Sequence, residues 1–153
     1  MSVDITLRIN GESHELSVSP TETVLDLLRG RLGLTGTNMD CCMGICGACT
    51  VLLDGRPVSS CLLLAVQADG GEIRTVESLE ENGRLTPLQD AFLRGGAVQC
   101  GYCTPGFLMT ATALLEENPT PTREEIVDAL KGNLCRCTGY KKIVEAVEFV
   151  ARG

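Results

Sequence analysis

Residues 40–50 read DCCMGICGACT and contain four of the nine cysteines in the 153-residue chain. Counted from Cys41 and extended to Cys61, the spacing is C-x4-C-x2-C-x11-C. A C-x4-C-x2-C run followed by a distant fourth cysteine is typical of a plant-type [2Fe–2S] cluster site. Counted from Cys42, the run begins C-x3-C and no longer fits. The stretch therefore indicates an iron–sulfur site and favours Cys41 as its first ligand.

The residues between these cysteines suit a buried anionic cluster. A [2Fe–2S] cluster held by four thiolates carries net negative charge, so it needs backbone N–H groups that point toward its sulfurs. A loop wrapped that tightly needs unusual backbone dihedrals, which Gly44 and Gly47 permit. We therefore expect this loop to fold around the cluster.

The remaining four cysteines lie in the second half of the chain with the spacing C-x2-C-x31-C-x-C. Each pair precedes a predicted helix, one beginning at Thr104-Pro105 and the other at Thr138-Gly139, and helix N-termini offer unpaired N–H groups to thiolates. Structural zinc is the main alternative for this quartet, because CxxC pairs are common in zinc sites. The final C-x-C is unusual for zinc, and disulfides are disfavoured without an export signal.

The first half of the chain reads as strands, loops and one helix. Apolar and polar residues alternate over 3–9 and continue at Leu16 and Val18, which predicts a hairpin turning at Gly11-Glu12. An amphipathic helix follows from Val24 and ends near Gly30 and Gly33. Three more strands are predicted at 50–53, 56–58 and 72–76, the first two joined by the turn dipeptide Asp54-Gly55.

From residue 77 the character of the chain changes to helical. Residues 77–84 (ESLEENGR) are acidic and lack apolar periodicity, which predicts a linker. Four helices follow, one beginning at Thr86-Pro87, one over 104–117, one after the capping box of Thr122 and Glu125, and one around 143–150. We therefore predict an α+β fold with a strand-rich domain at 1–78, a linker at 79–84 and a helical domain at 85–153.

Composition excludes several classes of function. The formal net charge of −7 disfavours nucleic acid as a partner, because phosphates would be repelled. No run of about 18 apolar residues is present, so we expect no membrane span. The opening MSVDITLRING lacks the pattern of a signal peptide. The expected compartment is the cytoplasm, where cysteine clusters more often hold metals than disulfides.

Four motifs together resemble a known family. They are Gly36-Thr37, CMGICGACTV at 42–51, QCGYCTPGF at 99–107 and GNLCRCTGY at 132–140. In this order they resemble the small iron–sulfur subunit of the molybdenum hydroxylases, the group of xanthine dehydrogenase, aldehyde oxidoreductase and CO dehydrogenase. The resemblance covers nearly the whole chain. It implies an electron-transfer subunit of an oxidoreductase, with no catalytic residue of its own.

The resemblance implies a β-grasp ferredoxin-like domain followed by a four-helix bundle, each with one [2Fe–2S] cluster. The implied ligands of the first cluster are Cys41, Cys46, Cys49 and Cys61. The implied ligands of the second cluster are Cys100, Cys103, Cys135 and Cys137. The second cluster would lie next to the molybdopterin of a large partner subunit, near which Gln99 and Cys137 are expected. The first cluster would face an FAD-binding or cytochrome subunit.

Two positions depart from the family pattern. Position 40 is often Gly and is Asp here, and position 42 is usually small or acidic and is Cys here. Asp40 tolerates left-handed backbone, and adjacent side chains in extended backbone point to opposite sides, so only one of Cys41 and Cys42 can reach the irons. The family register selects Cys41.

The sequence is also compatible with two other functions. One is a free-standing two-cluster ferredoxin that carries electrons between enzymes, and the other is a zinc-stabilised interaction module. A subunit should expose apolar docking surface when alone. The helix containing Phe107, Leu108, Met109, Leu114 and Leu115 has more apolar residues than a small bundle needs, which favours the subunit.

Overall fold

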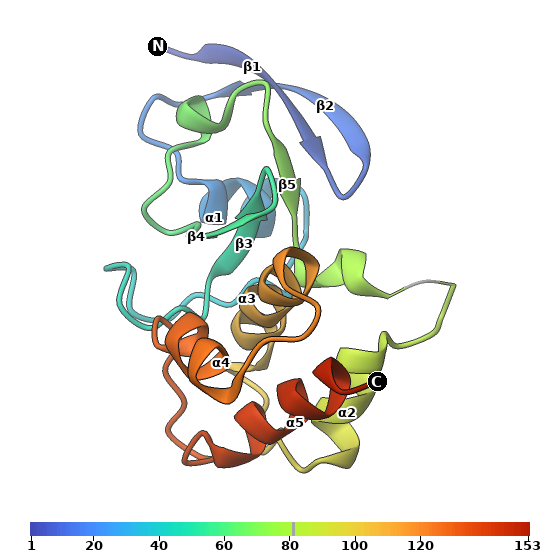
Figure 1. Ribbon diagram of the computed structural model, residues 1–153. Coiled ribbons are helices and arrows are strands. Elements are labelled where there is room, and N and C mark those ends of the chain that lie inside the picture. The colour runs from blue at the N-terminus through green and yellow to red at the C-terminus, as the bar shows by residue number, and fades with distance from the viewer. Residues whose placement is uncertain (81) are drawn as a thin grey trace.

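The computed structural model describes residues 1–80 and 82–153, so position 81 of the predicted linker lies outside the described residues. The first half is built on a five-stranded sheet in the order β2-β1-β5-β3-β4, which lies above the helical half in Figure 1. The strands are β1 Val3–Ile9, β2 Glu12–Val18, β3 Thr50–Leu53, β4 Arg56–Ser59 and β5 Glu72–Arg74. Strand β5 pairs in parallel with β1 and antiparallel with β3.

The hairpins follow from residue alternation and turn chemistry. Ile5, Leu7 and Ile9 are buried on one face of β1, as the period of two predicts. The first turn lies at Asn10-Gly11, one residue earlier than predicted, and both residues have positive φ. Asp54-Gly55 likewise has positive φ at both positions, the geometry that two-residue hairpin turns require.

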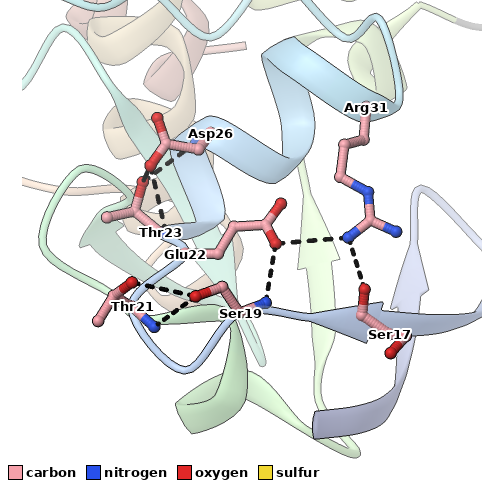
Figure 2. Close-up of polar contacts among 7 residues, drawn as sticks. All are labelled: Ser17, Ser19, Thr21, Glu22, Thr23, Asp26 and Arg31. Carbon is pink, nitrogen blue, oxygen red and sulfur yellow. Dashed lines mark hydrogen bonds and ion pairs between the residues drawn. The ribbon is translucent and has the colours of Figure 1, made fainter. Parts of the chain in front are cut away.

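The predicted first helix is short and changes its pitch. Helix α1 (Val24–Asp26) continues directly into a π-helical segment, η1 (Leu27–Arg31). Figure 2 shows the capping box at its start, where the Asp26 amide donates to the Thr23 hydroxyl at 3.1 Å. Arg31 at its end donates to the Ser17 carbonyl at 2.9 Å. The Arg31 contact fastens the end of the helix to β2, while Val24, Leu27 and Leu28 pack against the sheet.

The four predicted helices of the second half are confirmed. They are α2 Pro87–Arg94, α3 Thr104–Glu117, α4 Arg123–Leu130 and α5 Lys141–Ala151. Capping boxes at Thr86 with Gln89 and at Thr122 with Glu125 begin α2 and α4. The α+β prediction is therefore confirmed. Among residues 1–80 and 82–153, no helix is long and apolar enough to cross a membrane.

Helix α3 packs on two sides, which corrects one inference from its sequence. Phe107, Leu108 and Met109 are buried in the helical core, and α3 also lies against β3, whose Leu52 belongs to that same core. The apolar excess of this helix is therefore used within the chain and is no sign of a docking face.

The segment after the sheet is more ordered than an acidic linker would be. Strand β5 ends at Arg74, and Val76–Leu79 forms a short 3₁₀ helix, η3. Leu79 at its end is buried in the helical core. A second 3₁₀ helix, η2 (Ala65–Ala68), fills the apolar stretch after Cys61. The division at 79–84 stays a prediction.

Candidate metal centres

The first cysteine loop runs between η1 and β3 and depends on left-handed backbone. Gly44 and Gly47 have φ of 70° and 71°, which confirms the unusual dihedrals expected of them. A side chain at Gly44 would also collide with Leu62. Glycine thus lets the loop curl at both positions without the backbone strain that a Cβ atom adds at positive φ.

The first cysteine loop wraps around the Cys41 sulfur. This sulfur accepts backbone N–H groups from Met43, Ile45 and Cys46, each at 3.4 Å. These donors, Met43 first, lower the pKa of the Cys41 thiol to about 6. Hydrogen bonds of this kind favour a thiolate, which is the form that ligates iron.

The other three cysteines of this set are buried around it. Cys46, Cys49 and Cys61 are each less than one-tenth exposed. Burial raises the pKa of Cys61 to about 11, with smaller contributions from the neighbouring Cys49 and Cys41. Burial also raises the pKa of Cys46, which lies beside Cys41. The fold thus places Cys46 beside Cys41 and Cys61 beside Cys49 and Cys41, and their assignment as the ligands of one cluster stays a prediction.

Cys42 lies apart from this group, for a reason different from the one expected. Its side chain is exposed, and its backbone is left-handed, with φ of 52°. The argument from alternating side chains assumed extended backbone, so it does not describe this loop. Cys42, and not Asp40, is the non-glycine residue of this loop with positive φ.

The second quartet joins the start of α3 to the loop before α5. Cys103 is the N-cap residue of α3, as predicted. The other predicted start is wrong, because Gly139 and Tyr140 both have positive φ and α5 begins only at Lys141. Cys135 instead accepts from the Thr138 hydroxyl at 3.0 Å and the Thr138 amide at 3.4 Å.

The cysteines of this quartet lie close to one another in two pairs, Cys100 with Cys137 and Cys103 with Cys135. The Cys137 and Cys100 sulfurs are 3.6 Å apart, and both side chains are exposed. Burial, with smaller contributions from its contacts with Cys135 and Cys100, raises the pKa of Cys103 to about 12. Burial opposes ionisation of Cys135 too, but the Thr138 hydrogen bonds outweigh it and lower the pKa of Cys135.

The donor chemistry of both sites fits a bound [2Fe–2S] cluster. Each site offers four thiols, and at least one sulfur in each accepts N–H or O–H groups from its own loop. Such donors offset the negative charge of a thiolate-bound cluster. Gln99 is exposed beside Cys100 and has no hydrogen-bond partner among the described residues, so its role as a pterin contact stays a prediction.

The two cysteine loops meet at a junction that sequence reasoning missed. The Leu134 amide donates to the Cys46 carbonyl at 2.8 Å, and the Asn133 side chain donates to the Gly47 carbonyl at 3.0 Å. Asn38 donates to the Tyr102 carbonyl at 2.8 Å. These contacts join residues more than sixty positions apart, and no local pattern reports them. The one available signal was the unexplained Asn in GNLCRC.

Two comparisons define the class of protein. Residues 7–86 match the "2Fe-2S iron-sulfur cluster binding domain", and residues 75–148 match the "[2Fe-2S] binding domain". The chain is 57% identical over 145 residues to the nicotine 6-hydroxylase small subunit of Paenarthrobacter nicotinovorans, covering 95% of this chain and 87% of that one. It is 52% identical over 147 residues to the nicotinate dehydrogenase small FeS subunit of Eubacterium barkeri, covering 96% and 94%.

Among solved structures, the chain resembles quinoline 2-oxidoreductase from Pseudomonas putida 86. The TM-score is 0.94 with 49% identity, over 98% of this chain and 93% of that chain. Fold and cysteine sites thus define a protein with two [2Fe–2S]-binding domains, the first of them a β-grasp domain, as expected. The chain belongs to the family of small iron–sulfur subunits of molybdenum hydroxylases, which confirms the resemblance.

Proposed function

We propose that this chain relays electrons one at a time from the molybdenum centre of a large subunit to a flavin subunit. The observation that carries the proposal is the pair of cysteine quartets on either side of one hydrogen-bonded junction. When bound, each [2Fe–2S] cluster supplies one-electron redox chemistry. The chain itself contributes thiol ligands, N–H donors and a fixed arrangement of the two loops.

We assign the ligands as the resemblance implies. The first cluster would be held by Cys41, Cys46, Cys49 and Cys61. The second cluster would be held by Cys100, Cys103, Cys135 and Cys137. Cys100 and Cys137 of the second quartet are exposed, which suits electron entry from the molybdopterin subunit. The first loop exposes the apolar side chains Met43 and Ile45, and Leu62, which follows β4, is exposed beside Gly44 of this loop. This apolar surface suits a docking face for the acceptor subunit.

The names of the relatives favour a subunit over a free-standing ferredoxin, since two of them are called small subunits. Nicotine, nicotinate and quinoline are all nitrogen heteroaromatic compounds. We therefore propose that the complex hydroxylates a carbon of a nitrogen heteroaromatic ring, with water as the oxygen source. We also propose the cytoplasm as its compartment, because cysteine clusters there more often hold metals than disulfides.

Metal analysis tests the two ligand sets directly. The chain purified under anaerobic conditions should contain four irons and four acid-labile sulfides, two of each for each domain. After reduction it should give two distinct [2Fe–2S] electron paramagnetic resonance signals, because the two sites differ in burial and hydrogen bonding. Two irons together with about one zinc would sink the assignment of the helical site.

Replacing Gln99 tests the proposed contact with the partner's pterin. Gln99→Ala should keep four irons, because the side chain has no hydrogen-bond partner among the described residues. In the assembled complex, reduction of this chain by substrate should slow roughly tenfold if one hydrogen bond to the pterin is lost, measured by stopped-flow absorbance. Gln67→Ala, on the exposed part of η2, is the control of the same residue type. It removes a local hydrogen bond from the Leu64 amide and should leave this rate unchanged. An unchanged rate in Gln99→Ala would remove Gln99 from the site.

A further inference from the structure

The backbones of the two cysteine loops are in direct contact. The Leu134 amide, next to Cys135, donates to the carbonyl of Cys46 at 2.8 Å. This hydrogen bond therefore links Cys46, a proposed ligand of the first cluster, to the residue directly before Cys135, a proposed ligand of the second cluster. Its geometry depends on the neighbouring position 133, where the chain leaves the end of α4.

The Asn133 side chain joins three segments at this point. It is 4% exposed, and its Nδ2 donates to the Gly47 carbonyl at 3.0 Å and lies 3.4 Å from the Thr50 hydroxyl. Its Oδ1 accepts from the Thr110 hydroxyl of α3 at 2.9 Å. Because a carbonyl can only accept, the nitrogen of the amide must face Gly47.

The backbones of the two loops and of α3 pack closely around the Asn133 side chain. A Cβ atom at Gly47 would lie 2.5 Å from the Gly132 carbonyl and 2.6 Å from Asn133 Nδ2. A Cβ atom at Gly106 of α3 would collide with the Gly47 carbonyl. The amide therefore occupies a buried, closely packed place where losing a partner is costly.

We propose that Asn133 is a positioning residue that clamps the two cysteine loops together and so fixes the separation of the two metal sites. The proposal rests on the proposed function, because it takes the cysteine ligands as assigned there. Electron transfer between two centres slows steeply as they move apart. A clamp at the Cys46–Leu134 contact therefore holds the spacing that the relay needs.

The test uses the cluster-loaded chain with the variants Asn133→Asp and Asn133→Ala. The first keeps the shape but places a carboxylate oxygen against the Gly47 carbonyl, and the second removes the amide. Asn118→Ala, at the half-buried C-cap of α3, is the matched control, because it also removes amide hydrogen bonds, with Thr120 and Glu125, but outside the junction. Thr110→Val keeps the Gly47 bond and leaves Oδ1 unpaired, so it should have a smaller effect than either change at Asn133.

Two measurements separate positioning from a general loss of stability. Hydrogen exchange read by mass spectrometry should speed up about tenfold or more in the peptide containing Leu134, since a buried hydrogen-bond partner is lost. Peptides from α2 should exchange as before. With both clusters reduced, the magnetic interaction between them should weaken, because dipolar coupling falls with the cube of distance. Iron content should stay at four.

Unchanged exchange at Leu134, or an unchanged magnetic interaction in both Asn133 variants, would overturn the clamp. Uniform acceleration over the helical half would also overturn it, because that result means only lower stability. If neither Asn133 variant can be purified, Thr110→Val decides the question by the same two measurements. Fewer than four irons in the unmodified chain would count against the ligand assignment, while the exchange comparison would still test the contact itself.

Discussion

Cys41→Ser is expected to lose about half of the chain's iron, whereas Cys42→Ser should retain all of it. The Cys41 sulfur accepts three backbone N–H groups and lies beside Cys46, while Cys42 is exposed on left-handed backbone. A serine oxygen is a poorer iron ligand than a thiolate. Iron content and the two paramagnetic resonance signals measure the outcome, with the signal of the helical site kept in both variants.

Labelling of thiols is a second test of whether Cys41 or Cys42 is the first ligand. In the cluster-loaded chain, Cys42 should be the reactive cysteine, because its side chain is exposed and it is outside both proposed ligand sets. If Cys42→Ser loses two irons and Cys41→Ser keeps four, the register is displaced by one residue. The loop would then have to rearrange to a C-x3-C geometry.

Gly106→Ala should destabilise the chain, although helix propensity alone predicts the opposite. Alanine in the first turn of α3 favours the helix by up to about 1 kcal/mol. Its Cβ atom, however, would collide with the Gly47 carbonyl and lie 3.1 Å from Asn133 Nδ2. Overpacking against rigid backbone costs about 3 kcal/mol, so packing should win by about 2 kcal/mol. The Tm of the loaded chain should fall by about 4–8 °C.

Gly132→Ala is the matched control for this change. Gly132 lies at the same junction, but nothing is within 4 Å of the place its Cβ atom would take. Its Tm should therefore stay close to that of the unmodified chain. Equal melting of both variants and the unmodified chain would mean that the two loops can separate without loss, contrary to the packing at Gly106.

Local rules predicted much of this structure. Alternation over 3–9, the turn Asp54-Gly55 and the capping box of Thr122 each report a short-range preference, and each element was found where expected. The predicted start at Thr138-Gly139 failed because two successive residues there adopt left-handed backbone. A Tyr at the second of them gave no warning, since positive φ is rare for aromatic residues.

The sequence predicted the cysteine groups of the two sites but not the contacts between them. Spacing alone divided eight cysteines into two quartets, and the fold places cysteines of the same quartet near one another. The clamp at Asn133 could not be read from the sequence, because its partners Gly47 and Thr110 come from distant parts of the chain. The apolar side of α3 was misread for the same reason: the sequence shows how many apolar residues a helix has, but not how many neighbours cover them.

Strand β3 serves both halves of the chain. Val51 belongs to the core beneath the sheet, and Leu52, the next residue, belongs to the core of the helices. Successive side chains of a strand point to opposite faces. The four residues of β3 therefore contribute side chains to both hydrophobic cores. Melting of α3 would uncover Leu52, and loss of β3 would open the sheet between β4 and β5. Each half binds its own cluster, yet neither half can lose β3 or α3 without uncovering the core of the other, so we expect the two halves to unfold together.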